Sequence, residues 1–263
     1  MKDLKVGLQM YSVRQALKED FSGTLAKVKA MGYDYVEMAG GRYERTGDQI
    51  REELDKAGLT CISVHQSPSF FQNDPRDAVN YIKALGAENW VIPMWKKENF
   101  QDWEGTIRLF VEMLDTCGKE GLRLLYHNHD YEIYSGVLDR LLQQLPLSPE
   151  LDTCWVSYGG ADPVSVIDRY ADRLEIVHLK DYCCEALPPE PIWKLGERPE
   201  KRSAVGFRYT PMGSGVEDWQ AIMASVAQSA ARYVVVEQDA SKDREPLEAV
   251  AMSRRYLKGA YGI

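Results

Sequence analysis

The chain has 263 residues, of which 44% are hydrophobic and 27% are charged, and its formal net charge at pH 7 is −8. This acidic balance lacks the basic footprint of a protein that binds the nucleic-acid backbone, so we expect no nucleic-acid partner. A chain of this length can bury a large core as one domain, without disulfides or a structural metal.

Three further features of the composition indicate where the protein works. No segment approaches the roughly 18 apolar residues of a membrane helix, so we expect no membrane partner. The first twenty residues show no signal-peptide pattern. Five cysteines, an odd number without a CxxC pair, are typical of reduced thiols. We therefore expect a cytoplasmic protein.

Short apolar segments alternate with longer amphipathic segments along the chain. The short segments are rich in β-branched and aromatic residues, as buried parallel strands are. They predict strands over residues 5–10, 35–39, 61–65, 90–94, 124–128, 150–154, 175–180 and 233–238. The amphipathic segments predict helices, and several end in a glycine just before the next strand, where a left-handed helix cap is common: Gly32, Gly58, Gly86 and Gly121.

Eight strands, each followed by a helix, most economically close into a (β/α)8 TIM barrel that occupies residues 1–263 as a single domain. A doubly wound open sheet is the alternative, but no glycine-rich phosphate turn follows the first strand. Residues 181–216 are rich in proline, glycine and charge and predict a long loop at the rim of the barrel, as a lid or an interface. This loop is a candidate dimer contact in a homo-oligomer.

Polar residues gather where the predicted strands end. The segment LLYHNHDYE (124–132) turns from apolar residues to two of the four histidines of the chain. In a barrel, the catalytic groups lie at the carboxyl ends of the strands. All four histidines and two strand-end carboxylates are expected there: His65, His127, His129, His178, Asp152 and Glu237.

A shared divalent metal would stabilise these groups together, because a buried carboxylate is costly without a cation. A mixture of carboxylate and imidazole suits Mn²⁺, Zn²⁺, Fe²⁺ or Co²⁺ and does not suit a thiolate-rich structural zinc site. Among these ions and Mg²⁺ we expect Mn²⁺, although the residues themselves do not choose between the metals.

Several segments, in order along nearly the whole chain, resemble the xylose-isomerase-like TIM barrels, the sugar phosphate isomerase/epimerase superfamily. They read VGLQMYSVR, MGYDYVEMAG, LLYHNHDYE, ELDTCWV, EIVHLKD, MGSGVEDW and VVVEQD. The resemblance implies a metal held by an acid after strand five, an Asp after strand six, a His after strand seven and a Glu after strand eight. The last three correspond to Asp152, His178 and Glu237.

The first of these four positions departs from the pattern. Where many relatives have a Glu inside strand five, this chain has Tyr126 or His127. We expect Glu132 to be the ligand, with His127 as the alternative. Whichever of His127 and His129 does not bind the metal is expected to line the substrate pocket, as a base or as a contact to a hydroxyl. The superfamily also contains DNA-repair endonucleases with additional metal-binding histidines, but this chain has Pro93, Met94 and Trp95 near the place for such ligands.

A metal held in this way would polarise a sugar carbonyl and stabilise an enediolate. We expect Glu132 and Glu237 to be the acid/base pair, with His129 or His127 serving instead in a lyase. Substrate contacts are expected from His65, His127 and Lys180. Aromatic side chains for sugar faces are expected at the strand ends: Tyr11, Phe70, Phe71, Trp95, Trp155 and Tyr158. Basic residues are sparse there, which favours an unphosphorylated sugar or keto-sugar.

The main functional prediction is a metal-dependent sugar isomerase or epimerase. A dehydratase or β-eliminating lyase on a keto-sugar or inosose-like substrate is the first alternative, because it uses the same enediolate. A non-catalytic sugar-binding barrel is the second. Whether a proton is only exchanged, or a substituent is also lost, separates the two enzymes.

Overall fold

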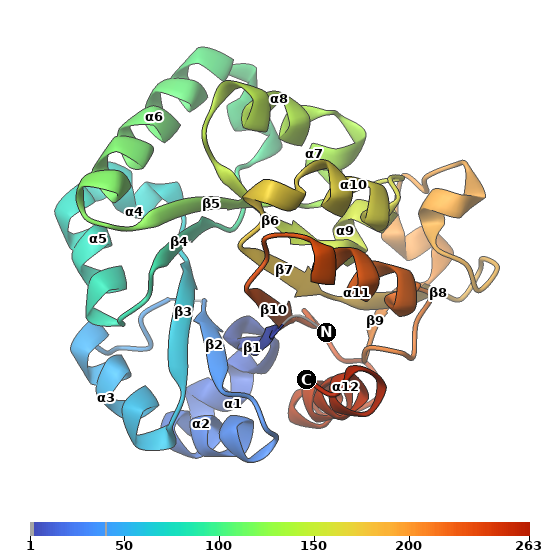
Figure 1. The fold of residues 1–263 in the computed structure, drawn as a ribbon, viewed down its shortest axis with the longest axis horizontal. Helices are drawn as coiled ribbons and strands as arrows, with labels where there is room; N and C mark the ends of the chain where they lie inside the picture. The colour runs from blue at the N-terminus through green and yellow to red at the C-terminus, as the bar shows by residue number, and fades with distance from the viewer. Residues whose placement is uncertain (1–2, 40) are drawn as a thin grey trace.

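A computed structural model of the chain describes residues 3–39 and 41–263, and its centre is a closed parallel barrel (Figure 1). The order of the strands around it is β1-β10-β7-β6-β5-β4-β3-β2, which confirms the predicted single-domain (β/α)8 barrel. The barrel strands are β1 (Lys5–Gln9), β2 (Tyr35–Met38), β3 (Thr60–His65), β4 (Asn89–Ile92), β5 (Arg123–His127), β6 (Ser148–Asp152), β7 (Ile176–Leu179) and β10 (Tyr233–Val236). Every predicted strand overlaps one of them.

Helices surround the barrel, as Figure 1 shows. They are α1 (Arg14–Glu19), α2 (Phe21–Ala30), α3 (Gly47–Ala57), α4 (Pro68–Asn73), α5 (Pro75–Ala84), α6 (Trp103–Lys119), α7 (Asp130–Tyr134), α8 (Val137–Gln144), α9 (Thr153–Tyr158), α10 (Pro163–Arg169), α11 (Trp219–Gln228) and α12 (Pro246–Tyr261). Short 3₁₀ turns η1 (Met10–Val13), η2 (Lys97–Gln101) and η3 (Ala171–Arg173) join some of them to their neighbours. The four predicted cap glycines all have positive φ, between 71° and 95°, which confirms their role.

Alternation along the strands creates two apolar layers. Outward-pointing residues of the strands pack under the helices in the larger layer. Inward-pointing residues fill the lower part of the barrel: Ile62, Val91, Leu125, Ile176, Tyr233 and Val235. Since side chains two apart share a face, the inward series continues up each strand to the rim.

The inward-pointing residues change from apolar to polar within one step along a strand. Leu125 is followed on the same face of β5 by His127, and Val235 on β10 is followed by Glu237. All four side chains are buried. Because neighbouring strands are in register, their carboxyl ends bring these polar residues to one mouth of the barrel.

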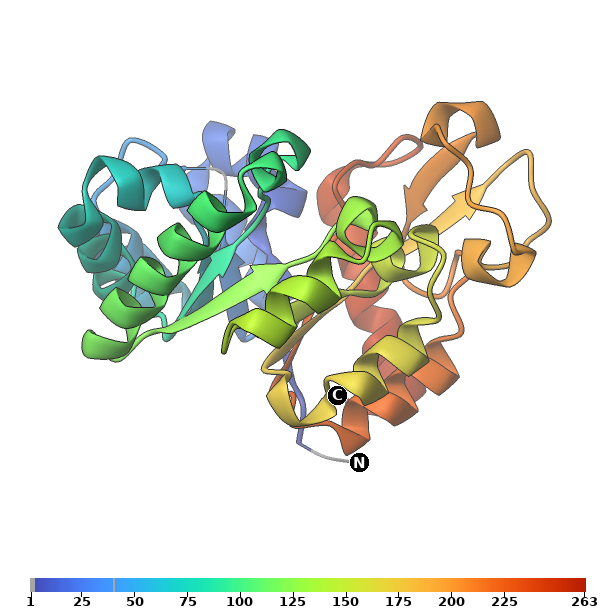
Figure 2. The same ribbon diagram turned by 90° about the horizontal axis from the view of Figure 1, so that it is seen from above.

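Residues 181–216 form a folded extension, so the prediction of a long irregular loop was wrong in kind. Strands β8 (Asp181–Cys184) and β9 (Phe207–Thr210) pair in antiparallel fashion, with turns η4 (Ile192–Leu195) and η5 (Arg202–Val205) between them. The extension stands apart from the ring of strands (Figures 1 and 2). Each strand is short and is stabilised by a partner more than 20 residues away, so neither gives a strong local signal.

An apolar cluster fastens this extension to the barrel. Trp155 on α9 stacks on Phe207, with their ring centroids 6.1 Å apart. At its base, the Asp181 carboxylate accepts hydrogen bonds from the backbone N–H groups of Gly213 and Gly215 and from the indole of Trp219. The extension is therefore a fixed wall beside the mouth. Across the described ranges 3–39 and 41–263, none of the helices has the length and apolar content needed to cross a membrane.

A substitution in the inner apolar layer should strongly destabilise the fold. Leu125 is fully buried inside the barrel, so Leu125→Ala should lower the free energy of unfolding by about 2–5 kcal/mol. Val111 on α6 is 48% exposed, and Val111→Ala should change it by less than about 0.5 kcal/mol. Chemical denaturation of both variants tests the assignment, and equal effects would contradict it.

Candidate active site

A cavity of about 480 Å³ opens at the carboxyl ends of the barrel strands. Three histidines lie in its wall with the ammonium group of Lys180 and two carboxylates, one of them that of Glu237. The complete lining is Tyr11, Ala39, His65, Pro93, Met94, His127, His129, Trp155, Lys180, Arg202, Tyr209, Glu237 and Asp239. We call this space the catalytic cavity.

Four side chains near the mouth form what we call the rim group: His127, Asp152, His178 and Glu237. One ligand atom of each lies within 4.8 Å of those of the others, and all four residues are buried. The Nδ1 atom of His178 is 2.9 Å from Glu237 Oε2, and His127 Nε2 is 3.9 Å from Asp152 Oδ2. The structure therefore brings together three of the predicted ligands, with His127 in the fourth place.

A second set lies one layer deeper in the barrel. This inner group consists of His65, His127, Glu150 and His178, whose ligand atoms also lie within 4.8 Å of one another. Glu150 Oε2 is 2.6 Å from His65 Nε2, 3.0 Å from His127 Nδ1 and 3.2 Å from His178 Nε2. Glu37 on β2 joins from the other side, with its Oε1 2.7 Å from His178 Nε2.

These contacts determine the charges of the imidazoles. Burial opposes a charge on His65, but the carboxylates of Glu37 and Glu150 outweigh it and raise its pKa to about 10. The pKa of His178 is raised well above its usual value by the same balance between burial and carboxylates, here led by Glu150. Burial, together with repulsion from His178, holds the pKa of His127 well below its usual value. Without a bound metal, His65 and His178 favour the imidazolium form and His127 favours the neutral form. A metal bound by His178 would displace the proton from the ligating nitrogen.

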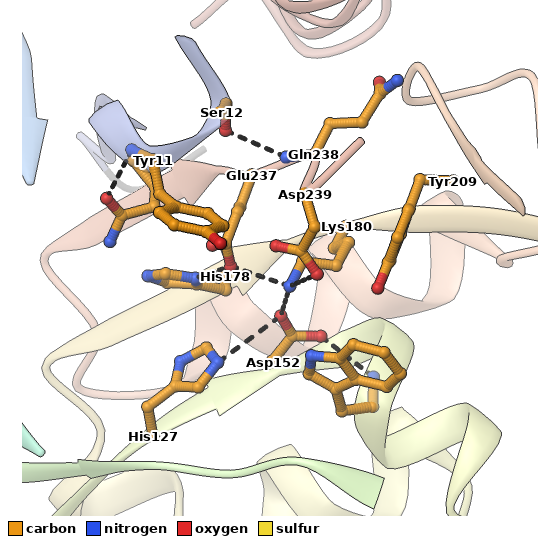
Figure 3. Close-up of polar contacts among 12 residues, drawn as sticks. Tyr11, Ser12, His127, Asp152, His178, Lys180, Tyr209, Glu237, Gln238 and Asp239 are labelled. Atoms are coloured by element: carbon orange, nitrogen blue, oxygen red, sulfur yellow. Dashed lines mark hydrogen bonds and ion pairs between the residues drawn. The ribbon is translucent and has the colours of Figure 1, made fainter. Parts of the chain in front are cut away.

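Lys180 stands at the centre of the rim carboxylates (Figure 3). Its Nζ lies 2.9 Å from Asp152 Oδ2, 2.8 Å from Glu237 Oε2 and 3.3 Å from Asp239 Oδ2. Burial opposes the ammonium charge, but these three carboxylates outweigh it and raise the Lys180 pKa well above its usual value. The side chain is 1% exposed, so Lys180 is a buried cation.

The donor set fits a divalent cation. Five carboxyl groups meet at the mouth, four of them buried and that of Asp239 partly exposed: Glu37, Glu150, Asp152, Glu237 and Asp239. Among the described residues, the buried Glu150 Oε1 has no hydrogen-bond partner, and Asp152 Oδ2 has ionic contacts only, at 2.9 Å to Lys180 and 3.9 Å to His127. Buried anionic oxygens beside neutral imidazole are ligands that divalent first-row metals prefer.

Glu132 is not among these groups, so the structure does not support its expected place beside Asp152 and His178. Its carboxylate accepts a hydrogen bond from the Tyr126 hydroxyl at 2.8 Å and from the His129 backbone N–H at 3.0 Å. Within residues 3–39 and 41–263, it belongs to neither metal-ligating group. The reason is local: Glu132 lies at the start of α7 and closes that helix by bonding back to residue 129.

His129 differs from the other three histidines in its surroundings. It lines the catalytic cavity, belongs to neither group, and its Nδ1 is buried without a hydrogen-bond partner among the described residues. Burial, followed by repulsion from Lys180, lowers its pKa to about 4. His129 is therefore a neutral imidazole at pH 7, free to accept a proton.

The aromatic residues predicted to line the substrate site lie in three different places. Tyr11 and Trp155 line the catalytic cavity, whereas Phe71 packs in the core against Trp90. Trp95 lies outside this cavity and lines a neighbouring one. Its ring is held by Phe110, 5.5 Å between centroids, and by a 3.0 Å hydrogen bond from its indole to Thr106.

Sequence reasoning missed Glu37 and Glu150, although a signal was present. Glu37 is a charged residue within the otherwise apolar strand β2, and Glu150 lies on β6 two residues before Asp152, on the same face of the strand. Arg202 and Tyr209 were also missed, because they reach the cavity from the folded extension. No pattern within a short segment of the sequence shows that residues 202 and 209 lie beside the cavity.

The barrel and its cluster of carboxylates, imidazoles and lysine define the class of protein, a TIM barrel with a polar catalytic mouth. A family model described as xylose isomerase-like TIM barrel matches residues 25–259. The chain belongs to that family, which confirms the resemblance seen in the sequence.

Individual relatives are more distant. An inosose dehydratase from Clostridium beijerinckii is 27% identical, over 92% of this chain and 90% of its own length. A crystal structure of a sugar phosphate isomerase/epimerase from Parabacteroides distasonis matches with a TM-score of 0.80 and 23% identity, covering 99% of this chain and 96% of that one. The IOLI protein with a binding zinc atom matches with a TM-score of 0.67 and 14% identity over 97% of each chain.

The rim group predicts which residues bind metal. His178→Ala and Asp152→Ala should each lose the bound divalent ion, because each removes a buried ligand. Glu132→Gln should retain it, since Glu132 bonds to Tyr126 and the backbone. Elemental analysis of the purified variants measures this. Loss of metal in Glu132→Gln alone would restore the ligand expected from the sequence.

Removing the charge of Lys180 should strengthen metal binding, whereas removing a ligand weakens it. Its ammonium contacts two carboxylates of the rim group, so it competes electrostatically with a cation. Lys180→Met should raise the affinity for Mn²⁺ by about tenfold or more, a change of about 1.4 kcal/mol or more. Titration calorimetry measures it, with Lys18→Met on the exposed face of α1 as the control. A weakened affinity would refute the competition.

Proposed function

We propose that this protein is a divalent-metal-dependent lyase that eliminates water or another β-substituent from a keto-sugar or inosose-like ring. The observation that carries the proposal is His129, a neutral imidazole at the catalytic cavity that belongs to neither group of metal-ligating residues. Epimerisation needs proton removal and return on opposite faces, for which Glu132 and Glu237 were the expected pair. Glu132 is engaged elsewhere, whereas elimination needs only one base beside the ring.

The names of relatives support the same choice. The Clostridium beijerinckii relative that covers 92% of this chain is an inosose dehydratase, and so is one from Lacticaseibacillus casei at 23% identity. We therefore place the lyase before the isomerase or epimerase that the sequence alone favoured.

The metal would be held by His127, Asp152, His178 and Glu237. When bound, a divalent ion supplies a Lewis acid that draws electron density from the substrate carbonyl. The zinc in the IOLI structure supports a divalent ion in this family of barrels. Mn²⁺ remains the metal we propose to test first.

His129 takes the proton from the carbon beside the carbonyl. A ring nitrogen of His129 accepts that proton, and the C–H electron pair forms the enolate double bond. The enolate then expels the hydroxyl from the next carbon with its electron pair. The hydroxyl leaves as water after gaining one proton, so the step is redox-neutral and yields an enone.

Two further groups have roles on the cavity wall. Lys180 is a permanent cation and stabilises the developing negative charge, with Asp152 and Glu237 holding its ammonium in place. Asp239 lines the cavity, and burial raises its pKa despite the opposing charge of Lys180. A carboxyl with a raised pKa suits a proton donor to the departing hydroxyl. Tyr11 and Trp155 supply faces for the ring.

The proposal predicts a product that can be seen directly. With Mn²⁺ present, incubation with an inosose should produce a conjugated enone, detected by ultraviolet absorbance and by loss of one water in the mass spectrum. Deuterium from D₂O exchanged into recovered substrate, with no loss of water, would instead favour the isomerase or epimerase. Absence of both would leave the non-catalytic barrel.

The base predicts a selective loss of rate. His129→Gln should lower kcat by about 100-fold or more, because it removes proton abstraction. Metal content should be unchanged, since His129 belongs to neither group of ligands. Stopped enone formation with retained Mn²⁺ and an unchanged melting temperature confirms the role. A variant with full activity would exclude His129 as the base.

A further inference from the structure

A second cavity adjoins the catalytic one. Its volume is about 750 Å³, and it shares two wall residues, Pro93 and Met94, with the catalytic cavity. Both residues follow β4 at the same carboxyl end of the barrel. The two spaces are therefore neighbours across one short segment.

The walls of this second cavity come from three segments. One wall begins at the N-terminus of α4, and the facing wall comes from η2 and the start of α6. The segment after β4 lies between them. The lining is Ser67, Ser69, Gln72, Pro93, Met94, Trp95, Lys96, Asn99, Asp102, Gly105, Thr106 and Leu109.

The chemistry of the lining combines polar side chains with a fixed aromatic ring. Gln72 and Asn99 make no side-chain hydrogen bond to any other residue in the described part of the chain, so their donors and acceptors are available. Trp95 is anchored by Phe110 and Thr106, which keeps its ring in place. Met94, which is 56% exposed, adds apolar surface at the shared wall.

We propose that this second cavity is a subsite for a neutral glycosyl unit attached to the ring in the catalytic cavity. The substrate class is then a keto-sugar that carries a second sugar. Hydroxyl groups of a sugar need several donors and acceptors, and its C–H face packs on an aromatic ring. The lining has one cation, Lys96, and one anion, Asp102, so it offers no excess charge to a phosphate or a carboxylate.

The size of the two cavities supports two occupants. A pocket of about 300–1,000 Å³ holds a ligand of drug size, and the catalytic cavity alone, at about 480 Å³, is large enough for one ring. A monocyclic substrate leaves the second cavity without a role. The inference rests on the proposed function only in placing a keto-sugar ring at the catalytic end.

Filling the second cavity tests the inference. Ser69 is exposed and lines this cavity without lining the catalytic one, so Ser69→Trp fills the subsite and leaves the catalytic groups in place. Ser22→Trp, at an exposed position on α2, is the matched control. Binding of 3-keto-cellobiose and of 3-keto-glucose to the Mn²⁺-loaded protein is measured by calorimetry.

The wild type should bind 3-keto-cellobiose about tenfold or more tightly than 3-keto-glucose, a difference of about 1.4 kcal/mol. Ser69→Trp should abolish this preference and leave the affinity for 3-keto-glucose within about twofold of the wild-type value. Ser22→Trp should keep the preference.

Three outcomes overturn the inference: equal affinity for both sugars in the wild type, no binding of either, or a preference that survives Ser69→Trp. A preference for an aryl 3-keto-glucoside without one for 3-keto-cellobiose also overturns it and assigns the cavity to an apolar group. Because the readout is binding, a preference seen without turnover supports the subsite and counts against the lyase alone.

Discussion

The burial of carboxylates at one mouth of the barrel is the constraint on which the rest of the site depends. Ionised carboxylates removed from water are stable only beside cations or hydrogen-bond donors. Lys180 supplies one positive charge. Without a bound metal, His65 and His178 supply two more, because their pKa values are raised. Carboxylate oxygens beside imidazole nitrogens make this mouth suitable for a divalent ion.

The strand alternation explains why these charges do not disrupt the fold. Apolar side chains fill the lower barrel, and the polar residues occupy the next inward positions of the same strands. The Leu125 to His127 step on β5 and the Val235 to Glu237 step on β10 show the change within one repeat. The barrel therefore has a dry lower core that provides stability, and a polar upper layer whose geometry that core keeps rigid.

The rim group and the inner group have His127 and His178 in common. The contacts that hold these two rings in the barrel therefore also orient them at the mouth. His178 faces Glu237 through Nδ1 and faces Glu37 and Glu150 through Nε2. A ligand whose second ring nitrogen is held by a carboxylate keeps a fixed ring orientation. The inner carboxylates therefore orient the rim imidazoles, while His129 remains outside both layers as a neutral base. That separation of roles is what favours an elimination with one base.

Much of the fold and part of the site could be predicted from the sequence. Each of the eight predicted strands overlaps a barrel strand, and the four predicted glycine caps have positive φ, because apolar runs and left-handed caps are local signals. Strand-end positions likewise located His178, Asp152 and Glu237. Glu132 was misplaced by reasoning along the chain, since its helix-closing bond to residue 129 competes with ligation. His127 takes the fourth place instead, because side chains alternate along β5 and that of His127 points into the barrel.

The sequence by itself determined the barrel, the rim on which chemistry is possible and the residue types available there, since all of these follow from period-two patterning and turn residues. Only the tertiary structure decided which oxygen and nitrogen atoms meet, which imidazoles carry a charge and which walls enclose the substrate. Those properties depend on distances between strands and on a folded extension whose two strands are more than 20 residues apart. Burial and pairing across the barrel set the charges, and neither is encoded in a local stretch.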